Sequence, residues 1–232
     1  MRPLPKSEDR ARICVPIIET TIEKAVGAIK EANAVADLIE LRVDYLKDVQ
    51  LASLTENTRK PFIVTNRRRE EGGRLRQNEQ ERVRILKEAT ALGANYLDVE
   101  MRSNRGLLHH LIKNRNEAKI ILSFHDLKGT PASKELKDLV DRMIRWRTDV
   151  IKVVTFARSW EDNLTILSLI PYARRRGQKI VTFCMGAKGK TSRIFSPLMG
   201  AAWTYASLSS DRASAPGQLT VGQTREIWKR LR

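Results

Sequence analysis

The chain has 232 residues, of which 41% are hydrophobic and 30% are charged. This balance supports a folded core and argues against wholesale disorder, and no apolar stretch approaches the roughly 20 residues that span a bilayer. With 43 Lys and Arg against 27 Asp and Glu, the net charge is +16, which favours anionic partners but does not bear on the fold.

Short apolar runs rich in β-branched residues alternate with amphipathic segments along the chain. In chain order, strands are expected at residues 13–17, 38–44, 61–67, 96–101, 119–125, 149–156, 179–185 and, as the weakest, 204–208. Helices are expected at residues 21–33, 47–58, 80–93, 106–114, 134–146, 160–176 and 220–232. Residues 1–11, which precede the first strand, are expected to form a flexible segment.

The alternation of strand and helix is typical of a parallel sheet. Eight units divide 232 residues into 29 residues each, which leaves no room for a second domain. An open doubly wound sheet of six strands would leave two units unassigned, whereas a closed barrel uses all eight. We therefore predict an α/β protein, a single (β/α)8 TIM barrel over residues 1–232, with its active site at the C-terminal ends of the strands.

Histidine and cysteine are too few and too scattered for a metal site or a disulfide framework. Cys14 and Cys184 lie far apart in apolar runs, and the histidines are His109, His110 and His125. Without a Cys-x-x-Cys motif or a Cys/His cluster, we expect no disulfide, no metal and no cofactor. The N-terminus has no apolar segment of the signal-peptide type, so we expect a cytoplasmic protein that does not span a membrane.

Polar residues occupy one face of several predicted strands. Glu40, Arg42 and Asp44 alternate with apolar residues in the second strand. Lys152 interrupts the apolar sixth strand, and His125 ends the fifth. An antiparallel sheet with one wet face would explain this alternation, but the intervening helices are too long for hairpins. In a barrel these side chains point inward, where ionisable groups are costly unless they pair or line a ligand site. The pattern therefore predicts an active site.

A lysine and a histidine on neighbouring strands indicate a specific chemistry. Desolvation disfavours the ammonium form of a buried lysine such as Lys152, and a neutral amine attacks a ketone or aldehyde to form an imine. A histidine such as His125 can remove and return a proton near neutral pH. Proton abstraction beside an imine fits aldol cleavage or β-elimination. The alternative is that Lys152 only forms an ion pair with Asp98 or Glu100.

Seven motifs follow one another along the predicted strands and loops. They are IELRVD (39–44), the Arg-then-Glu-Gly-Gly pattern in NRRREEGGR (66–74), YLDVE (96–100), ILSFHD (121–126), IKVVTFA (151–157), Ser-Arg (192–193) and ASAPGQ (213–218). From about Ile13 to Val221, the chain resembles the type I 3-dehydroquinate dehydratases, which are (β/α)8 lyases of the shikimate pathway. The resemblance implies a cofactor-free conversion of 3-dehydroquinate to 3-dehydroshikimate and water, on the route to chorismate and the aromatic amino acids, in a cytoplasmic homodimer.

The resemblance also implies three catalytic residues. Lys152 would form the imine with the substrate ketone and so make the adjacent proton easier to remove. His125 would take that proton and then protonate the departing hydroxyl, which gives a syn elimination. Glu71 would hydrogen-bond to His125 and fix its tautomer and orientation.

The substrate-binding residues implied by the resemblance are Glu40, Arg42, Arg67, Arg193, Ser214 and Gln218. The planar guanidinium of Arg193 suits the substrate carboxylate, and Glu40 and Arg67 would contact the ring hydroxyls. Ser214 and Gln218 lie in a loop of small residues that is typical of a mobile lid. We expect Arg42, together with Asp44, to support the site more than to touch the substrate.

Two positions depart from the family pattern. Asn66 stands where the family often has an aromatic residue, and Phe183 stands where methionine is common. In addition, the run from Arg67 to Glu71 allows an assignment shifted by one position. Neither departure removes a group that the reaction needs.

Two other functions are compatible with parts of the sequence. Another Schiff-base barrel enzyme, such as a class I aldolase, would share Lys152, although Arg193 and the ASAPGQ loop argue against it. A basic nucleic-acid-binding protein would explain the net charge, but the sequence has no recognisable nucleic-acid motif. We therefore expect a small-molecule substrate and no specific nucleic-acid partner.

Overall fold

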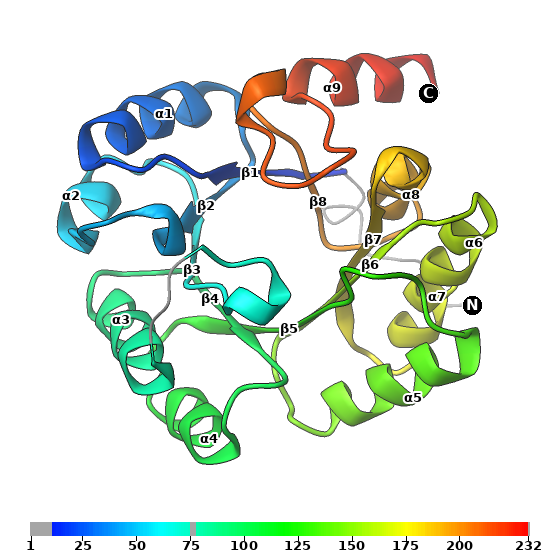
Figure 1. Ribbon diagram of the computed structural model, residues 1–232, viewed down its shortest axis with the longest axis horizontal. Helices are drawn as coiled ribbons and strands as arrows, with labels where there is room; N and C mark the ends of the chain where they lie inside the picture. Colours follow the sequence, from blue (N-terminus) through cyan, green and yellow to red (C-terminus); the bar gives the residue numbers. More distant parts are fainter. Residues whose placement is uncertain (1–10, 75–77, 232) are drawn as a thin grey trace.

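The computed structural model describes residues 11–74 and 78–231, and within these ranges eight parallel strands form a barrel (Figure 1). Strands β1 to β7 pair in chain order, and β1 also pairs with β8. The backbone N–H of Ala202 donates to the carbonyl of Ile180 at 2.8 Å and joins β8 to β7. The strands are β1 (Ile13–Ile17), β2 (Leu38–Arg42), β3 (Phe62–Thr65), β4 (Tyr96–Glu100), β5 (Lys119–His125), β6 (Val150–Phe156), β7 (Lys179–Met185) and β8 (Thr204–Tyr205). The prediction of a (β/α)8 barrel is confirmed.

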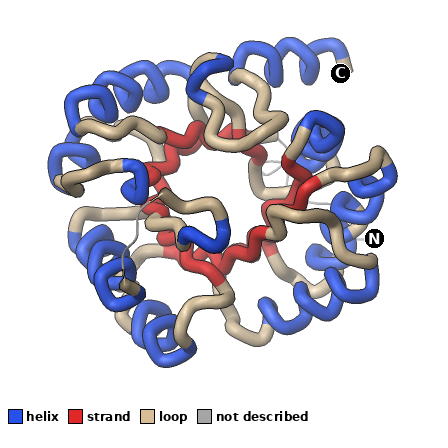
Figure 2. Tube along the Cα trace, viewed as in Figure 1, coloured by secondary structure: helices blue, strands red, loops and turns tan. Residues whose placement is uncertain are grey.

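Helices form an outer ring around the strands (Figure 2). Four of them begin after a residue whose side chain accepts a hydrogen bond from the first turn, as expected for helix caps: Thr21, Asn78, Asn104 and Thr220. The helices are α1 (Ile22–Val35), α2 (Leu51–Glu56), α3 (Glu79–Ala91), α4 (Arg105–Lys113), α5 (Ser133–Ile144), α6 (Glu161–Leu167), α7 (Leu169–Arg174), α8 (Lys190–Leu198) and α9 (Val221–Arg230). None of the described helices is long and apolar enough to cross a membrane.

The structure differs from the predicted helices in two places. Helix α8 was not predicted. The helix predicted at 160–176 is two helices, α6 and α7, and Pro171 has no N–H to donate to the carbonyl of Leu167. Residues 1–10 of the predicted flexible segment lie outside the described residues, and Ala11 is buried.

Two apolar clusters lie on opposite sides of the strand wall. The outer cluster joins the outward residues of the strands, such as Leu41, Val99 and Ile151, to the helices. The inner cluster fills the barrel around Trp203, which packs edge-on against Tyr96 with ring centroids 5.4 Å apart. The alternation of the strands therefore has the predicted sense, with the apolar face toward the helix ring. The other face leaves room for buried polar groups inside the barrel.

Candidate active site

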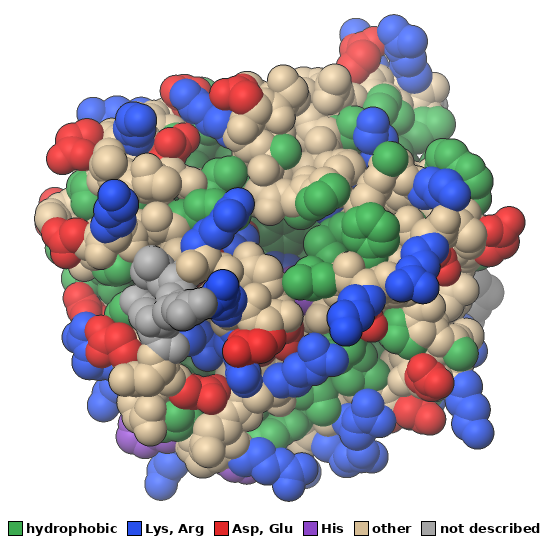
Figure 3. Space-filling view, in the orientation of Figure 1, with side chains coloured by type: hydrophobic (Ala, Val, Ile, Leu, Met, Phe, Trp, Pro, Cys, Tyr) green, Lys and Arg blue, Asp and Glu red, His purple; other side chains and the backbone are tan. Residues whose placement is uncertain are grey.

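A cavity of about 370 Å³ opens at the C-terminal ends of the strands. A space-filling view of this face shows a central hollow with Lys and Arg side chains gathered around it (Figure 3). The residues predicted for the site that line the cavity are Glu40, Arg42, Arg67, Glu71, His125, Lys152, Arg193 and Ser214. Gln218 does not line it. The barrel thus brings together side chains that are more than 170 positions apart in the sequence, as between Glu40 and Ser214.

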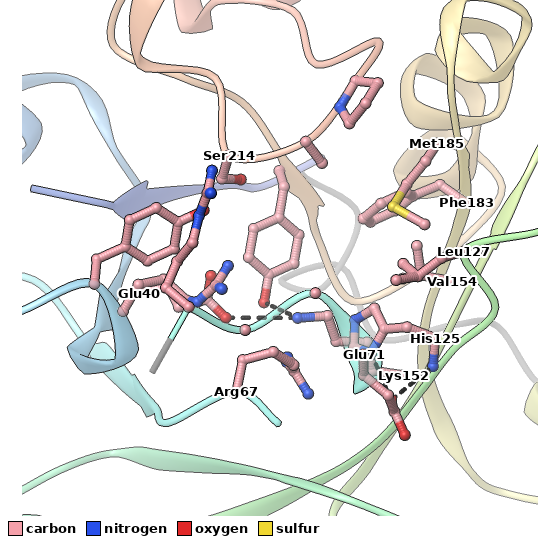
Figure 4. Close-up of a pocket in the computed structure, with 18 of the residues that line it drawn as sticks. Glu40, Arg67, Glu71, His125, Leu127, Lys152, Val154, Phe183, Met185 and Ser214 are labelled. Atoms are coloured by element: carbon pink, nitrogen blue, oxygen red, sulfur yellow. Dashed lines mark hydrogen bonds and ion pairs between the residues drawn. The ribbon is translucent and has the colours of Figure 1, made fainter. Parts of the chain in front are cut away.

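Lys152 extends into this cavity from β6 (Figure 4). Its Nζ donates to Asp98 Oδ2 at 3.0 Å and to the hydroxyl of Tyr205 at 3.1 Å, and it lies 3.5 Å from Glu40 Oε1. Lys152 is therefore surrounded by polar groups, although the strand that carries it is otherwise apolar. Its neighbours in sequence point outward to the helices, while the amine faces the polar interior. The ion pair with Asp98, which was the alternative interpretation, is present.

A chain of buried ion pairs continues from Asp98. The guanidinium of Arg67 donates to Asp98 and to Glu100, both at 2.9 Å, and to the hydroxyl of Ser123 at 2.7 Å. Arg82 from α3 also pairs with Glu100. Burial alone would raise the pKa of Asp98, but Arg67 and Lys152 hold that pKa well below its usual range. Asp98 is therefore a permanent carboxylate that compensates two cations.

His125 and Glu71 form a second unit on the other side of Lys152. The Oε2 atom of Glu71 accepts from the backbone N–H of His125 at 2.9 Å and lies 3.0 Å from its Nδ1. Burial raises the pKa of Glu71 to about 7. Burial, then the positive charges of Arg67 and Lys152, lower the pKa of His125 well below its ordinary value. The imidazole is thus neutral near pH 7, and its Nε2 is not used by Glu71.

Arg193 has a different environment. It lies in the first half of α8 and is 3% exposed, yet its Nε and Nη2 atoms have no hydrogen-bond partner among the described residues. Its guanidinium carbon lies 4.3 Å from the centre of the Phe183 ring. Burial lowers the pKa of Arg193 to about 10, so the side chain remains a cation at neutral pH. An uncompensated buried cation that lines a cavity indicates a site for an anion.

Arg42 already has a partner. Its Nε and Nη2 atoms donate to the two carboxylate oxygens of Asp44, both at 2.8 Å. Its guanidinium also stacks on the ring of Tyr45. The guanidinium of Arg74, in the loop between β3 and α3, lies over the same ring. Arg42 therefore lines the cavity while its guanidinium is bound to Asp44.

The loop between β8 and α9 covers one side of the cavity. Ser214 lines the cavity, and its N–H and hydroxyl donate to Gln218 Oε1 at 2.6 and 3.1 Å. Gly186 N–H donates to the Pro216 carbonyl at 3.0 Å, and a Cβ atom on Gly217 would come within 2.0 Å of the Gly186 oxygen. Gln218 therefore acts within the loop, which rests against the end of β7.

Comparison with known proteins assigns the chain to a protein family. The sequence model described as "Type I 3-dehydroquinase" matches residues 13–231. The chain belongs to the type I 3-dehydroquinase family. The 3-dehydroquinate dehydratase of Methanococcus maripaludis strain S2 is 38% identical over 221 residues, which cover 94% of this chain and 98% of that protein.

Solved structures of the family have the same fold. A type I 3-dehydroquinate dehydratase from Clostridium difficile, crystallised with covalently modified comenic acid, has a TM-score of 0.88 and 26% identity, covering 97% of this chain and 93% of that chain. The 3-dehydroquinate dehydratase of Geobacillus kaustophilus has a TM-score of 0.88 and 25% identity, covering 96% and 91%.

The two positions that depart from the type I 3-dehydroquinase pattern are both buried. The carbonyl of Asn66 accepts from Arg82 Nε at 3.0 Å, which ties α3 to the end of β3. Phe183 lies between Arg193 and Tyr205, and its ring centroid is 5.9 Å from that of Tyr205. Arg67 and Glu71, at the two ends of the run, are both buried and line the cavity.

Sequence reasoning did not single out Tyr205. The residue lies in the strand predicted at 204–208, and its register opposite Cys14 places it inside the barrel. The signal that the sequence offered was a tyrosine within this predicted strand. The strand was too short and irregular for its inward positions to be assigned from sequence alone.

Proposed function

We propose that this chain dehydrates 3-dehydroquinate to 3-dehydroshikimate through an imine between the substrate ketone and Lys152. Membership of the type I 3-dehydroquinase family supports the substrate and the overall reaction. The observation that carries the mechanism is that one cavity contains the Lys152 amine, the His125–Glu71 pair and the uncompensated guanidinium of Arg193.

Substrate binding begins with the carboxylate. Two N–H groups of Arg193 that bind none of the described residues form a planar donor pair that matches a carboxylate in shape and charge. Binding supplies the negative charge that the buried guanidinium lacks, and it holds the ring in one orientation over Lys152. Glu40 and Arg67 line the same cavity and are placed to contact ring hydroxyls, although Arg67 is already bonded to three side chains.

The amine of Lys152 attacks the ketone carbon, and loss of water gives the protonated imine. His125 then removes a proton from the carbon next to the imine, and the electron pair of that C–H bond moves toward the imine nitrogen, giving an enamine. When the electrons return, the C–O bond of the leaving hydroxyl breaks, and the proton held by His125 completes a water molecule. Because one base takes and returns the proton from one side, the elimination is syn. Hydrolysis of the imine releases the product.

Glu71 controls which nitrogen of His125 does this work. When Glu71 is ionised, its Oε2 accepts the Nδ1 proton, which leaves the lone pair on Nε2. Ser214 covers the site from the loop between β8 and α9 and is held there by Gln218. Exclusion of water around the enamine is the expected benefit of this cover.

Borohydride reduction tests the mechanism directly. Treatment with 3-dehydroquinate and borohydride, followed by peptide mass mapping, is expected to show a stable adduct on Lys152. Lys152→Ala should lose both the adduct and turnover by at least about 10⁴-fold, which is the scale of losing a nucleophile. His125→Ala should lose turnover but still be trapped. An adduct on another lysine, or full turnover by Lys152→Ala, would overturn the proposal, and turnover of an aldol substrate in place of 3-dehydroquinate would favour the class I aldolase alternative.

The homodimer and the cytoplasmic location stay predictions. Light scattering on the purified chain measures the mass of the assembly, and cell fractionation locates the protein. A monomer, or a protein found outside the cytoplasm, would show these predictions to be wrong without affecting the mechanism.

A further inference from the structure

Tyr205 ends strand β8 inside the barrel, and its hydroxyl contacts the amine on which the proposed imine forms. Lys152 Nζ donates to this hydroxyl at 3.1 Å, and the same amine lies 4.4 Å from the centre of the tyrosine ring. Tyr205 is 5% exposed and lines the cavity. The hydroxyl is therefore both buried and next to the reacting nitrogen.

Within the described part of the chain, three side chains place an oxygen within 3.5 Å of Lys152 Nζ: Asp98, Glu40 and Tyr205. Asp98 also binds Arg67 and is held as a carboxylate, so it can accept hydrogen bonds but has no proton to give. Glu40 accepts a hydrogen bond from Thr65 at 2.8 Å and is the most distant of the three from Nζ. A hydroxyl differs from both carboxylates because it accepts and donates at the same time.

We propose that Tyr205 is a catalytic residue of imine formation and imine hydrolysis, in which its hydroxyl relays a proton between the Lys152 nitrogen and the former carbonyl oxygen of the substrate. This inference rests on the proposed function. It assigns to Tyr205 the proton transfers on the nitrogen side of the substrate and leaves to His125 those on the carbon side.

The proposed relay has two proton-transfer steps, carbinolamine formation and loss of water. Lys152 first gives its ammonium proton to water. Attack of the resulting neutral amine on the ketone forms a C–N bond and moves the C=O π electrons to oxygen, so nitrogen is positive and oxygen negative. Tyr205 accepts a proton from nitrogen and gives its own to oxygen, which yields a neutral carbinolamine. In the second step, the nitrogen lone pair forms C=N as the C–O bond breaks, and the proton from Tyr205 leaves with the hydroxyl as water. The remaining nitrogen proton belongs to the iminium, and Tyr205 regains from water the proton that Lys152 released; hydrolysis reverses these transfers.

The surroundings of Tyr205 suit a relay that stays neutral at rest. Burial, then the negative charge of Glu40, raise the pKa of Tyr205 well above its ordinary value, so the hydroxyl keeps its proton. The ring packs beside Phe183 with centroids 5.9 Å apart, which fixes the direction of the hydroxyl. The face of the same ring lies against Nζ and stabilises positive charge there in every step.

Tyr205→Phe removes the hydroxyl and keeps the ring. Rapid mixing with 3-dehydroquinate, quenching in borohydride and mass analysis measures how fast the Lys152 adduct accumulates. We expect this rate to fall on the order of 100-fold, the scale of one general acid–base contribution. Tyr96→Phe is the matched control, because Tyr96 packs on Trp203 in the inner apolar cluster and should leave the rate unchanged. An adduct rate equal to that of the unsubstituted chain would overturn the inference.

A second variant keeps the test decisive if Tyr205→Phe is poorly folded. Tyr205→Ala opens a space beside Lys152, and added phenol should restore part of the adduct rate, whereas benzene should not. Equal rescue by both compounds would show that Tyr205 only fills space. The unsubstituted chain separates the two proposals: if it forms no adduct with 3-dehydroquinate, the proposed function fails, whereas a normal adduct rate in the Tyr205 variants removes the relay alone.

Discussion

Two buried cations of the same cavity have opposite electrostatic surroundings. Lys152 has the carboxylates of Asp98 and Glu40 and the hydroxyl of Tyr205 around its amine. Arg193 has an aromatic ring beside it, and two of its nitrogens find no hydrogen-bond partner in the residues that the structure describes. The protein compensates the cation that reacts and leaves uncompensated the cation that binds. A ligand therefore gains most by bringing its own negative charge to Arg193.

The difference also explains how the barrel tolerates so much buried charge. Arg67, Asp98 and Lys152 belong to one continuous set of ion pairs, so each charge has a partner of opposite sign. Among the described residues, Arg193 is a buried cation with two unpaired nitrogens, and it lines the cavity. Stability is lowered there in exchange for specific binding, which is a common arrangement at functional sites.

The largest effect is expected from Asp98→Asn, which breaks the compensated region. The substitution leaves Lys152 and Arg67 with an excess of buried positive charge, and losing one partner of a buried ion pair costs about 3–5 kcal/mol. Urea unfolding should show a decrease of this size in the free energy of unfolding. Asp138→Asn, at an exposed position of α5, is the control and should change it little. Equal stability of the two variants would mean that the ion pairs do not compensate each other.

Arg193→Met tests the uncompensated cation. It should raise the free energy of unfolding, whereas Asp98→Asn should lower it. Removing an uncompensated buried cation is expected to raise the free energy of unfolding by about 1–4 kcal/mol. The same change should lower kcat/KM on the order of 100-fold, since a lost partner in a buried charge pair costs about 2–5 kcal/mol. Arg84→Met, at an exposed position of α3, should do neither. A variant that is both less stable and fully active would contradict the assignment of Arg193 as the carboxylate site.

The sequence predicted only part of the difference between the surroundings of Lys152 and those of Arg193. The strand pattern correctly predicted the barrel and the inward direction of Glu40 and Lys152, because alternation along a strand is a local property. The partners of Lys152 come from β2, β4 and β8, and their approach depends on how the barrel closes. For that reason the sequence around Lys152 did not identify Glu40 and Tyr205 as neighbours of its amine.

Helix α8 shows a second limit of sequence reasoning. Its sequence, KTSRIFSPL, has few apolar positions at helical spacing and contains Pro197, so periodicity did not predict a helix. Arg193 was therefore identified only through the resemblance to a family. Its lack of partners is a property of the folded chain, and no motif records it.

The next prediction concerns the pH dependence of kcat and rests on Glu71. This residue is a buried acid whose second carboxylate oxygen has no hydrogen bond within the described structure. Burial raises the pKa of Glu71 to about 7. Below that pH the protonated carboxyl donates to His125 Nδ1, the imidazole proton moves to Nε2, and the base is lost. We expect kcat to fall as pH decreases through about 7. Since the pKa of His125 itself is lowered, the imidazole does not cause this fall.

The Glu71→Gln variant tests whether Glu71 or His125 causes the fall in kcat. The amide donates to Nδ1 at every pH, so the variant should behave like the protonated form and lose about 10- to 100-fold in kcat, no more than general acid–base catalysis supplies. Its kcat should no longer change near pH 7. A pH profile of kcat that is the same in both proteins would assign the titration to another group.

The smallest effect is expected from an arginine that is paired but exposed. Arg212, at the end of the short 3-10 helix Ser210–Arg212, lies 3.0 Å from Glu31 and 3.6 Å from Glu19 and so ties the loop that carries Ser214 to the region of α1. Exposed ion pairs contribute at most about 1 kcal/mol and are screened by salt. Arg212→Ala should therefore raise KM only about two- to fivefold, with little change in kcat.

The loss should also depend on ionic strength, in contrast to that of the buried Arg193. Addition of salt should raise KM of the unsubstituted chain toward that of Arg212→Ala, because both treatments release the same end of the loop. The reverse-charge pair Arg212→Glu with Glu31→Arg should restore only part of the original KM at low salt, because Glu19 also lies beside position 212. Arg230→Ala removes a similar exposed pair with Glu226 on α9 and should leave KM unchanged. Equal effects of the Arg212 and Arg230 variants would show that net charge, and not the position of the loop, sets KM, because each variant removes one positive charge but only Arg212 is linked to the loop.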